Sequence, residues 1–301
     1  MICQHSKSNL LQQINGEVLF SCNECSSIYK KTNIDPQDHY KDFYKNEIAT
    51  RFHSPIEILI RGFRFFRAFK IFTLYPGAKR ILDVGCGRGY LLYYLKKIFH
   101  YEVADGTQIS KNAVDFARNT LKLNIYANDL LQLKLKPDSY DIVSLWHVLE
   151  HVKNPEEYVK EIMNILKPNG KIIIEVPNFN SWTRPITGKY WLGLDLKNHI
   201  HFFTPNTLIN LLRKYKYKIN KVHTYSLEYS TFISTESLVS RITNSEQKFY
   251  KAIQGKGSYH KILHHILLFL LLAPIFFIIN GLLFFSKRGE VLLVIARKNE
   301  S

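Results

Sequence analysis

The nine-residue stretch Ile81–Gly89, with the sequence ILDVGCGRG, constrains this chain more than any other. Its first four residues predict a buried strand, its three glycines a turn with little side-chain bulk, and Tyr90 begins a helix. A strand, a glycine turn and a helix in this order present backbone N–H groups to a ligand. The glycines follow G-x-G-x-G rather than the G-x-G-x-x-G of dinucleotide binders, and Asp83 precedes the turn. This pattern favours a nucleoside that carries an amino acid over a pyrophosphate, and the alternative is an ordinary strand-to-helix turn.

Two later motifs place polar residues after predicted strands. The sequence HVLEHV starts at His147, after the strand predicted over 139–146, and Asp129 follows the strand predicted over 123–127. With the glycine turn, these motifs resemble the class I S-adenosylmethionine (SAM)-dependent methyltransferases, including the ubiquinone-biosynthesis-like members. The resemblance implies an α/β fold: a Rossmann-like sheet of seven strands with helices on both faces. Its last strand, expected at 290–297, would run antiparallel beside the strand expected at 218–225.

The resemblance also implies SAM as the methyl donor and a set of residues that would hold it. These residues are Asp83, Gly85, Cys86, Gly87, Gln108, Asp129, Leu130 and His147. Gln108 departs from the family pattern, in which an Asp or Glu accepts hydrogen bonds from both ribose hydroxyls. Glutamine can accept one hydrogen bond and donate another, but it lacks the charge.

A long connection, predicted over 178–205, follows the central strand and carries two histidines. Methyl transfer to an oxygen needs a base that removes the acceptor's proton, and a histidine near neutral pKa suits that task. We expect His199 to be this base, with His147 second. The alternative is that both histidines only hydrogen-bond the loop. His199 and His201 alone make a poor metal pair, because no carboxylate cluster lies near them in the sequence.

The N-terminal segment contains a second set of metal-ligand residues. Cys22 and Cys25 form a C-x-x-C pair, and Cys3 with His5 could supply the other half of a zinc site. The related methyltransferases carry two C-x-x-C knuckles, whereas Ser6 stands here where the second cysteine of the first knuckle would be. A zinc ribbon and a short β-ribbon with free thiols both stay open.

Charge and hydropathy indicate an anionic surface as partner. Lys+Arg total 41 against Asp+Glu 25, a formal net charge of +16. The helix predicted over 55–72 carries a basic stripe among phenylalanines, formed by Arg61, Arg64, Arg67 and Lys70. It either lies on an anionic bilayer or packs before the first strand with solvated arginines. The nearly uninterrupted apolar run 262–285 predicts a re-entrant or in-plane helical hairpin broken at Pro274, with a helix pair that covers the sheet or a dimer interface as the alternative.

These observations predict a methyltransferase at the cytoplasmic face of a membrane. The start of the chain has no secretory signal, which favours a reducing compartment. The acceptor would be lipid-linked, such as a polyprenyl-linked glycan or an isoprenoid quinone, or a small molecule. Alternatives are a methyltransferase-fold scaffold without activity and, less favoured because no RNA-stacking motif is present, an RNA methyltransferase. The oligomeric state stays open. The expected segments are a ribbon at 1–33, a helical cap at 34–78, the SAM-binding domain at 79–228, an apolar insertion at 229–286 and the final strand at 287–301.

Overall fold

The computed structural model describes residues 7–32, 54–253, 262–283 and 286–299. Its centre is a sheet of seven strands in the order β10-β11-β8-β7-β4-β5-β6. The strands are β4 (Arg80–Val84), β5 (Val103–Thr107), β6 (Asn124–Tyr126), β7 (Tyr140–Trp146), β8 (Leu166–Pro177), β10 (Tyr217–His223) and β11 (Val291–Lys298).

Neighbouring strands of this sheet are parallel except around β11, which runs antiparallel to both β8 and β10. The predicted α/β fold and the position of the antiparallel last strand are therefore confirmed. Parallel strands join through crossovers, so the carboxyl ends of β4, β5 and β7 meet at one edge of the sheet. The glycine turn, Gln108 and the HVLEHV motif all begin at this edge.

Alternating side chains of the central strands build one hydrophobic core on each face of the sheet. Leu82, Val143 and Ile174 belong to the core that is completed by α5 (Pro155–Ile165) and α7 (Pro205–Lys214). Ile81, Ile142 and Ile173 belong to the opposite core, which is completed by α2 (Ser54–Leu74), α3 (Tyr90–Lys97) and α4 (Lys111–Asn119). Helices on both faces explain why these strands are nearly continuous apolar runs.

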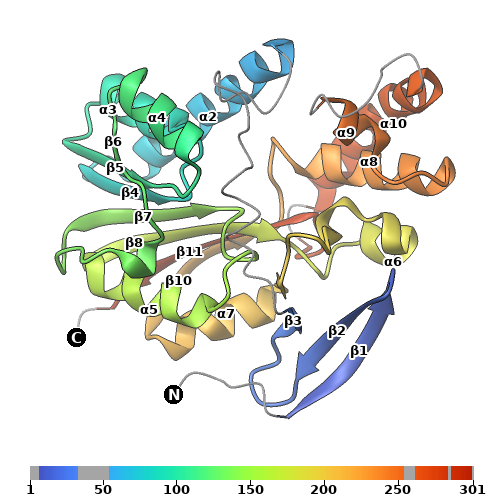
Figure 1. Ribbon diagram of the computed structural model, residues 1–301, viewed down its shortest axis with the longest axis horizontal. Helices are drawn as coiled ribbons and strands as arrows, with labels where there is room; N and C mark the ends of the chain where they lie inside the picture. The colour runs from blue at the N-terminus through green and yellow to red at the C-terminus, as the bar shows by residue number, and fades with distance from the viewer. Residues whose placement is uncertain (1–6, 33–53, 254–261, 284–285, 300–301) are drawn as a thin grey trace.

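The N-terminal segment forms a ribbon that projects from the main sheet (Figure 1). Strands β1 (Ser8–Ile14), β2 (Glu17–Cys22) and β3 (Ile28–Lys30) are joined in one sheet by β9 (His201–Phe202) from the long connection. That connection also contains α6 (Thr183–Thr187) and the 3-10 turns η2 (Gly188–Tyr190) and η3 (Leu192–Leu194). A third apolar cluster, which includes Leu19, Trp191 and Ile233, packs the ribbon and the connection against α8 (Ser230–Ile242).

The apolar run before the last strand differs from the predicted hairpin. It forms one continuous helix, α10 (Leu263–Leu282), which follows α9 (Lys248–Ile253). Pro274 lies inside α10 on its exposed side and does not break the helix. The buried side of α10, formed by His265, Phe269, Phe276 and Asn280, packs on α8, which helps to offset the hydrogen bond that proline cannot make.

The helix α2 packs on the sheet before β4, as one of the two predicted arrangements has it, but it differs in the environment of its basic stripe. Arg67 is buried, and Arg64 is largely covered rather than solvated. The exposed side of α2 is instead apolar and consists of Ile58, Leu59, Phe65, Phe66, Phe69 and Leu74. The prediction of solvated arginines was wrong for Arg64 and Arg67, because these two face buried acids that lie far away in the sequence.

Candidate functional site

The glycine turn joins β4 to α3 in a backbone conformation that needs glycine. Gly85, Gly87 and Gly89 have φ of 68°, 56° and 81°, all in the left-handed region. A Cβ at Gly85 would lie 2.6 Å from Cγ2 of Val148, so the turn also packs directly on the HVLEHV segment. Val148 therefore fills one side of Gly85, and close packing accounts for part of the glycine requirement at this position.

Asp83 lies in β4, two residues before the turn, and is buried. The hydroxyl of Ser144 on β7 donates a hydrogen bond of 2.6 Å to its carboxylate. Burial raises the pKa of Asp83 to about 6, with Ser144 and the nearby Arg67 opposing that rise. A cationic ligand group at this carboxylate would favour its charged form.

Gln108 follows β5 at the same edge of the sheet. Its Oε1 accepts hydrogen bonds from the backbone N–H groups of Ile109 and Ser110, at 2.8 and 3.0 Å. The side chain thus binds the start of α4 through its oxygen, and its amide nitrogen keeps the capacity to donate. This arrangement leaves Gln108 weaker than a carboxylate as an acceptor for ribose hydroxyls.

The other predicted cofactor residues lie around these two positions. Cys86 donates its backbone N–H to the carbonyl of Thr107 at 3.0 Å, and its sulfur packs beside Gly106. Asp129 accepts hydrogen bonds from the N–H of Leu131 and the hydroxyl of Tyr158. A carboxylate has about four acceptor positions, so Asp129 can accept a further donor. The side chain of Leu130 is buried in the sheet core.

His147 begins the HVLEHV segment in a strained backbone conformation, with φ of 54°. Its Nδ1 lies 3.2 Å from Oε1 of Glu150, and its Nε2 lies 3.4 Å from Oε1 of Glu175 on β8. Burial disfavours the charged ring, but the two glutamates outweigh it and raise the pKa of His147 to about 9. The two glutamates therefore favour the imidazolium form of His147, which is a poor proton acceptor.

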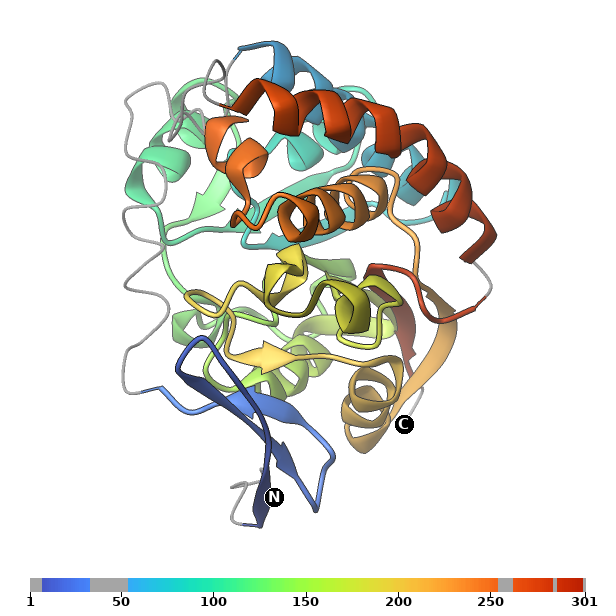
Figure 2. The ribbon, with the colours of Figure 1, turned by 90° about the vertical axis from the view of Figure 1, so that its right-hand side faces the viewer.

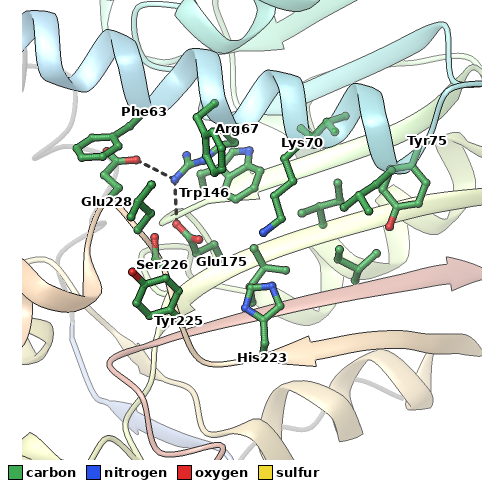
Figure 3. A pocket seen from close by; sticks show the side chains of 17 residues that line it. Phe63, Arg67, Lys70, Tyr75, Trp146, Glu175, His223, Tyr225, Ser226 and Glu228 are labelled. Carbon is green, nitrogen blue, oxygen red and sulfur yellow. Dashed lines mark hydrogen bonds and ion pairs between the residues drawn. The ribbon is translucent and has the colours of Figure 1, made fainter. Parts of the chain in front are cut away.

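Glu175 joins the His147 segment to α2. Arg67 donates hydrogen bonds of 3.0 Å to Glu175 and to Glu228 (Figure 3), and Arg64 also pairs with Glu228. Against the effect of burial, Arg67 and His147 lower the pKa of Glu175 to about 2. Sequence reasoning missed this network, although a single acid inside the apolar strand β8 was a signal, because a buried carboxylate needs a partner.

His199 lies in the long connection beside the HVLEHV segment rather than beside His201. Its Nδ1 is 3.1 Å from the carbonyl of Gly193, so Nδ1–H donates there and Nε2 can accept a proton. Glu150, His151 and His199 have ligand atoms within 4.8 Å of one another, the geometry of a group that could hold a metal ion. His201 instead places Nε2 3.3 Å from the carbonyl of Lys153.

The predicted zinc residues are described only in part. Cys3 and His5 lie outside the described residues. Cys22 is buried at the end of β2, and the sulfur of Cys25 lies 2.9 Å from the hydroxyl of Ser27. The zinc site therefore stays a prediction, as do the roles assigned to the cofactor and catalytic residues.

The sheet order, the antiparallel last strand and the glycine turn after β4 together define the Rossmann-like class I methyltransferase fold. A family model described as a methyltransferase domain matches residues 60–222, more than half of the 301 residues. The chain belongs to this family of methyltransferase domains.

Individual relatives agree with the family over part of the chain. The ubiquinone biosynthesis O-methyltransferase of Coxiella burnetii is 33% identical over 107 residues, which cover 34% of this chain and 45% of that protein. The protein of the same name from Photobacterium profundum is 33% identical over 148 residues, covering 44% and 61%. The chain thus spans about half the length of the curated relatives it matches.

A solved structure supports the fold alone. Phosphoethanolamine N-methyltransferase 2 of Haemonchus contortus, solved in complex with SAM, is 16% identical and has a TM-score of 0.55. The similarity covers 91% of this chain and 62% of that one.

Proposed function

We propose that this protein is a SAM-dependent O-methyltransferase that acts on a lipid-linked or membrane-proximal acceptor. The observation that carries the proposal is the left-handed glycine turn at Gly85–Gly89, beside a buried Asp83, at the carboxyl edge of the sheet. The relatives named ubiquinone biosynthesis O-methyltransferases support transfer to an oxygen.

The residues at this edge fit SAM. The buried carboxylate of Asp83 suits an ammonium group, and the left-handed turn after it leads into the N-terminus of α3 at the same edge of the sheet. Gln108 would donate to one ribose hydroxyl, and Asp129 would accept from the adenine amino group. SAM carries its methyl group on a positively charged sulfur. This charge makes the methyl carbon electrophilic without help from a metal.

The acceptor hydroxyl must lose its proton as the new carbon–oxygen bond forms and the carbon–sulfur bond breaks. We assign this proton to Nε2 of His199, because its Nδ1–H is held by the carbonyl of Gly193. His147 is the less suitable base, because its two glutamate partners keep it charged. Its imidazolium would instead stabilise negative charge on the acceptor oxygen.

The membrane part of the proposal is supported by two exposed apolar faces. α10 is the one helix in the described part of the chain that is long and apolar enough to cross a membrane. Large exposed residues line its outer side, among them Leu267, Leu270, Leu271, Ile275 and Ile278. Figures 1 and 2 show α2 and α10 at the same end of the molecule, with α10 along its outside. We propose that both helices face the lipid.

An in-plane position suits α10 better than a crossing. Asn280 donates to the hydroxyl of Ser234 at 2.7 Å, and Nε2 of His265 lies 3.1 Å from Oε2 of Glu236, with both of these side chains fully buried. A helix that left α8 to cross the bilayer would bring these polar groups into lipid, which is costly.

The test is methyl transfer from labelled SAM to an extract of cell membranes. Mass spectrometry should find an acceptor that gains one labelled methyl group only when the protein is present. His199→Gln should lower the rate by about 100-fold or more, because a general base contributes roughly that much. His100→Gln, an exposed histidine between α3 and β5, is the matched control. Equal rates for His199→Gln and the wild type would exclude His199 as the base.

A second candidate is a methyltransferase-fold scaffold without activity. The observation that favours it is Gln108, whose oxygen is already bonded to the start of α4. The two candidates differ in SAM affinity, because a scaffold that lost the chemistry has no need to bind SAM.

A further inference from the structure

A pocket of about 130 Å³ lies between α2 and the main sheet, and no residue of the glycine turn lines it (Figure 3). Its floor is apolar and buried and is formed by Ile71, Ile173, Leu293 and Ile295. Trp146 and Glu175 lie at the end that borders His147. Unlike a closed core cavity, the pocket combines an apolar floor with charged side chains from α2.

The acids that line the pocket are both paired with Arg67 and not with Lys70. Lys70 extends from α2 into the pocket toward His223 (Figure 3). It forms no ion pair with any residue between 54 and 253 or in the other described ranges. The two lining acids, Glu175 and Glu228, are already paired with Arg67, at 3.0 Å each.

The environment of Lys70 is more positive still. Burial lowers its pKa, and the nearby Lys221 and Arg67 lower it further, while Glu175 opposes them. His223 is neutral, because burial and then the two lysines lower its pKa to about 4. An anion next to Lys70 would relieve this repulsion and form a charge-assisted hydrogen bond.

The rim of the pocket is apolar and exposed. Phe66, Leu74 and Leu227 have exposed fractions of 50%, 44% and 44%. The volume holds only a short piece of a chain, so a longer apolar ligand would continue over these rim residues. Phe66 and Leu74 also belong to the apolar face of α2 that we place against the lipid.

We infer that this pocket binds a long-chain amphiphile whose anionic group contacts Lys70. The apolar floor and rim take the chain, and Lys70, which forms no ion pair within the described residues, takes the charge. The amphiphile would also be the methyl acceptor if the proposed function holds, and only this part of the inference rests on the proposed function. Binding itself needs neither SAM nor methyl transfer and is measured separately.

The test uses the full chain and three probes: a fluorescent long-chain fatty acid, a long-chain alcohol of equal length and a short-chain carboxylate. We expect the fatty acid to bind most tightly. Lys70→Met keeps the unbranched stem of the side chain but removes the ammonium group, and it should weaken fatty-acid binding by about tenfold, since hydrogen bonds to charged groups contribute this much. Its affinity for the alcohol should be unchanged.

Two further variants separate the charge at Lys70 from general effects. Lys218→Met removes an exposed positive charge from the same strand as Lys221 and should bind the fatty acid like the wild type. Leu227→Asp places a negative charge on the exposed rim and should weaken the binding of the fatty acid. Equal fatty-acid affinity in Lys70→Met and the wild type would overturn the inference, and so would equal affinity for the short carboxylate.

The same samples are titrated with SAM. Fatty-acid binding without SAM binding would leave the pocket in place and remove the proposed methyl transfer. SAM binding without fatty-acid binding would overturn the inference about the pocket and leave the proposed methyl transfer in place.

Discussion

At the scale of single residues, the site depends on charges that are buried together. His147, Glu150, Glu175 and Arg67 are each within ion-pair distance of at least one other member. Each charge alone would be costly to bury, and the group is tolerated because opposite charges alternate. The strained backbone of His147 is held in place by the same contacts.

The pKa of His147 predicts how stability depends on pH. Its folded pKa of about 9 lies above its usual value of 6.5, so its contribution is complete below pH 6.5 and is lost as pH rises through 9. We expect His147→Gln to lower the free energy of unfolding by on the order of 3 kcal/mol at pH 6, and by much less near pH 10. Urea denaturation of both proteins at a series of pH values measures this. A difference that stays constant with pH would contradict the charged His147.

Arg67 gives a prediction at neutral pH. Arg67→Met should destabilise the protein by about 3 to 5 kcal/mol, because it leaves Glu175 and Glu228 buried with fewer partners. Arg213→Met, an exposed arginine on α7, is the matched control and should stay within about 0.5 kcal/mol of the wild type. Chemical denaturation distinguishes them, and equal midpoints for the two variants would refute the role given to Arg67.

At the scale of helices and strands, local sequence signals explain what could be predicted. The strand at Ile81–Val84, its glycine turn and the helix after it carry their own signals, and the structure has all three. No local signal in the sequence shows which side of α2 is buried. Arg67 contacts Glu175, 108 residues later, so its burial follows from tertiary structure. For the same reason, propensity at Pro274 predicted a break that packing on α8 overrides.

The exposed face of α10 predicts binding to lipid vesicles. Leu271→Glu places a charge on that face, where the exposed fraction of Leu271 is 69%. We expect it to reduce flotation with anionic vesicles severalfold, because a buried charge opposes insertion into the bilayer. Leu10→Glu, on the exposed ribbon strand β1, is the control and should float like the wild type. If Leu271→Glu also floats normally, α10 is not the lipid-binding element.

At the scale of the whole molecule, the chain brings three distant segments to one edge of the sheet. The glycine turn and the HVLEHV segment were predictable there, because parallel strands end at the same edge. His199 of the long connection was expected at the site, but its contact with Glu150 was not, since His199 reaches Glu150 only after the connection folds onto the ribbon and α8. The ring of His199 packs against the ring of His151 rather than beside His201. Spacing along the chain could not have shown this contact.

The central claim is that this edge of the sheet holds SAM, and isothermal titration calorimetry of the full chain with SAM tests it most directly. We predict one binding site with a Kd below roughly 1 mM, the upper end of usual enzyme affinities. Asp83→Asn should weaken it by about tenfold, through loss of the carboxylate, whereas Asp115→Asn on the exposed side of α4 should not. A folded wild-type protein that gives no binding heat at millimolar SAM would contradict the account.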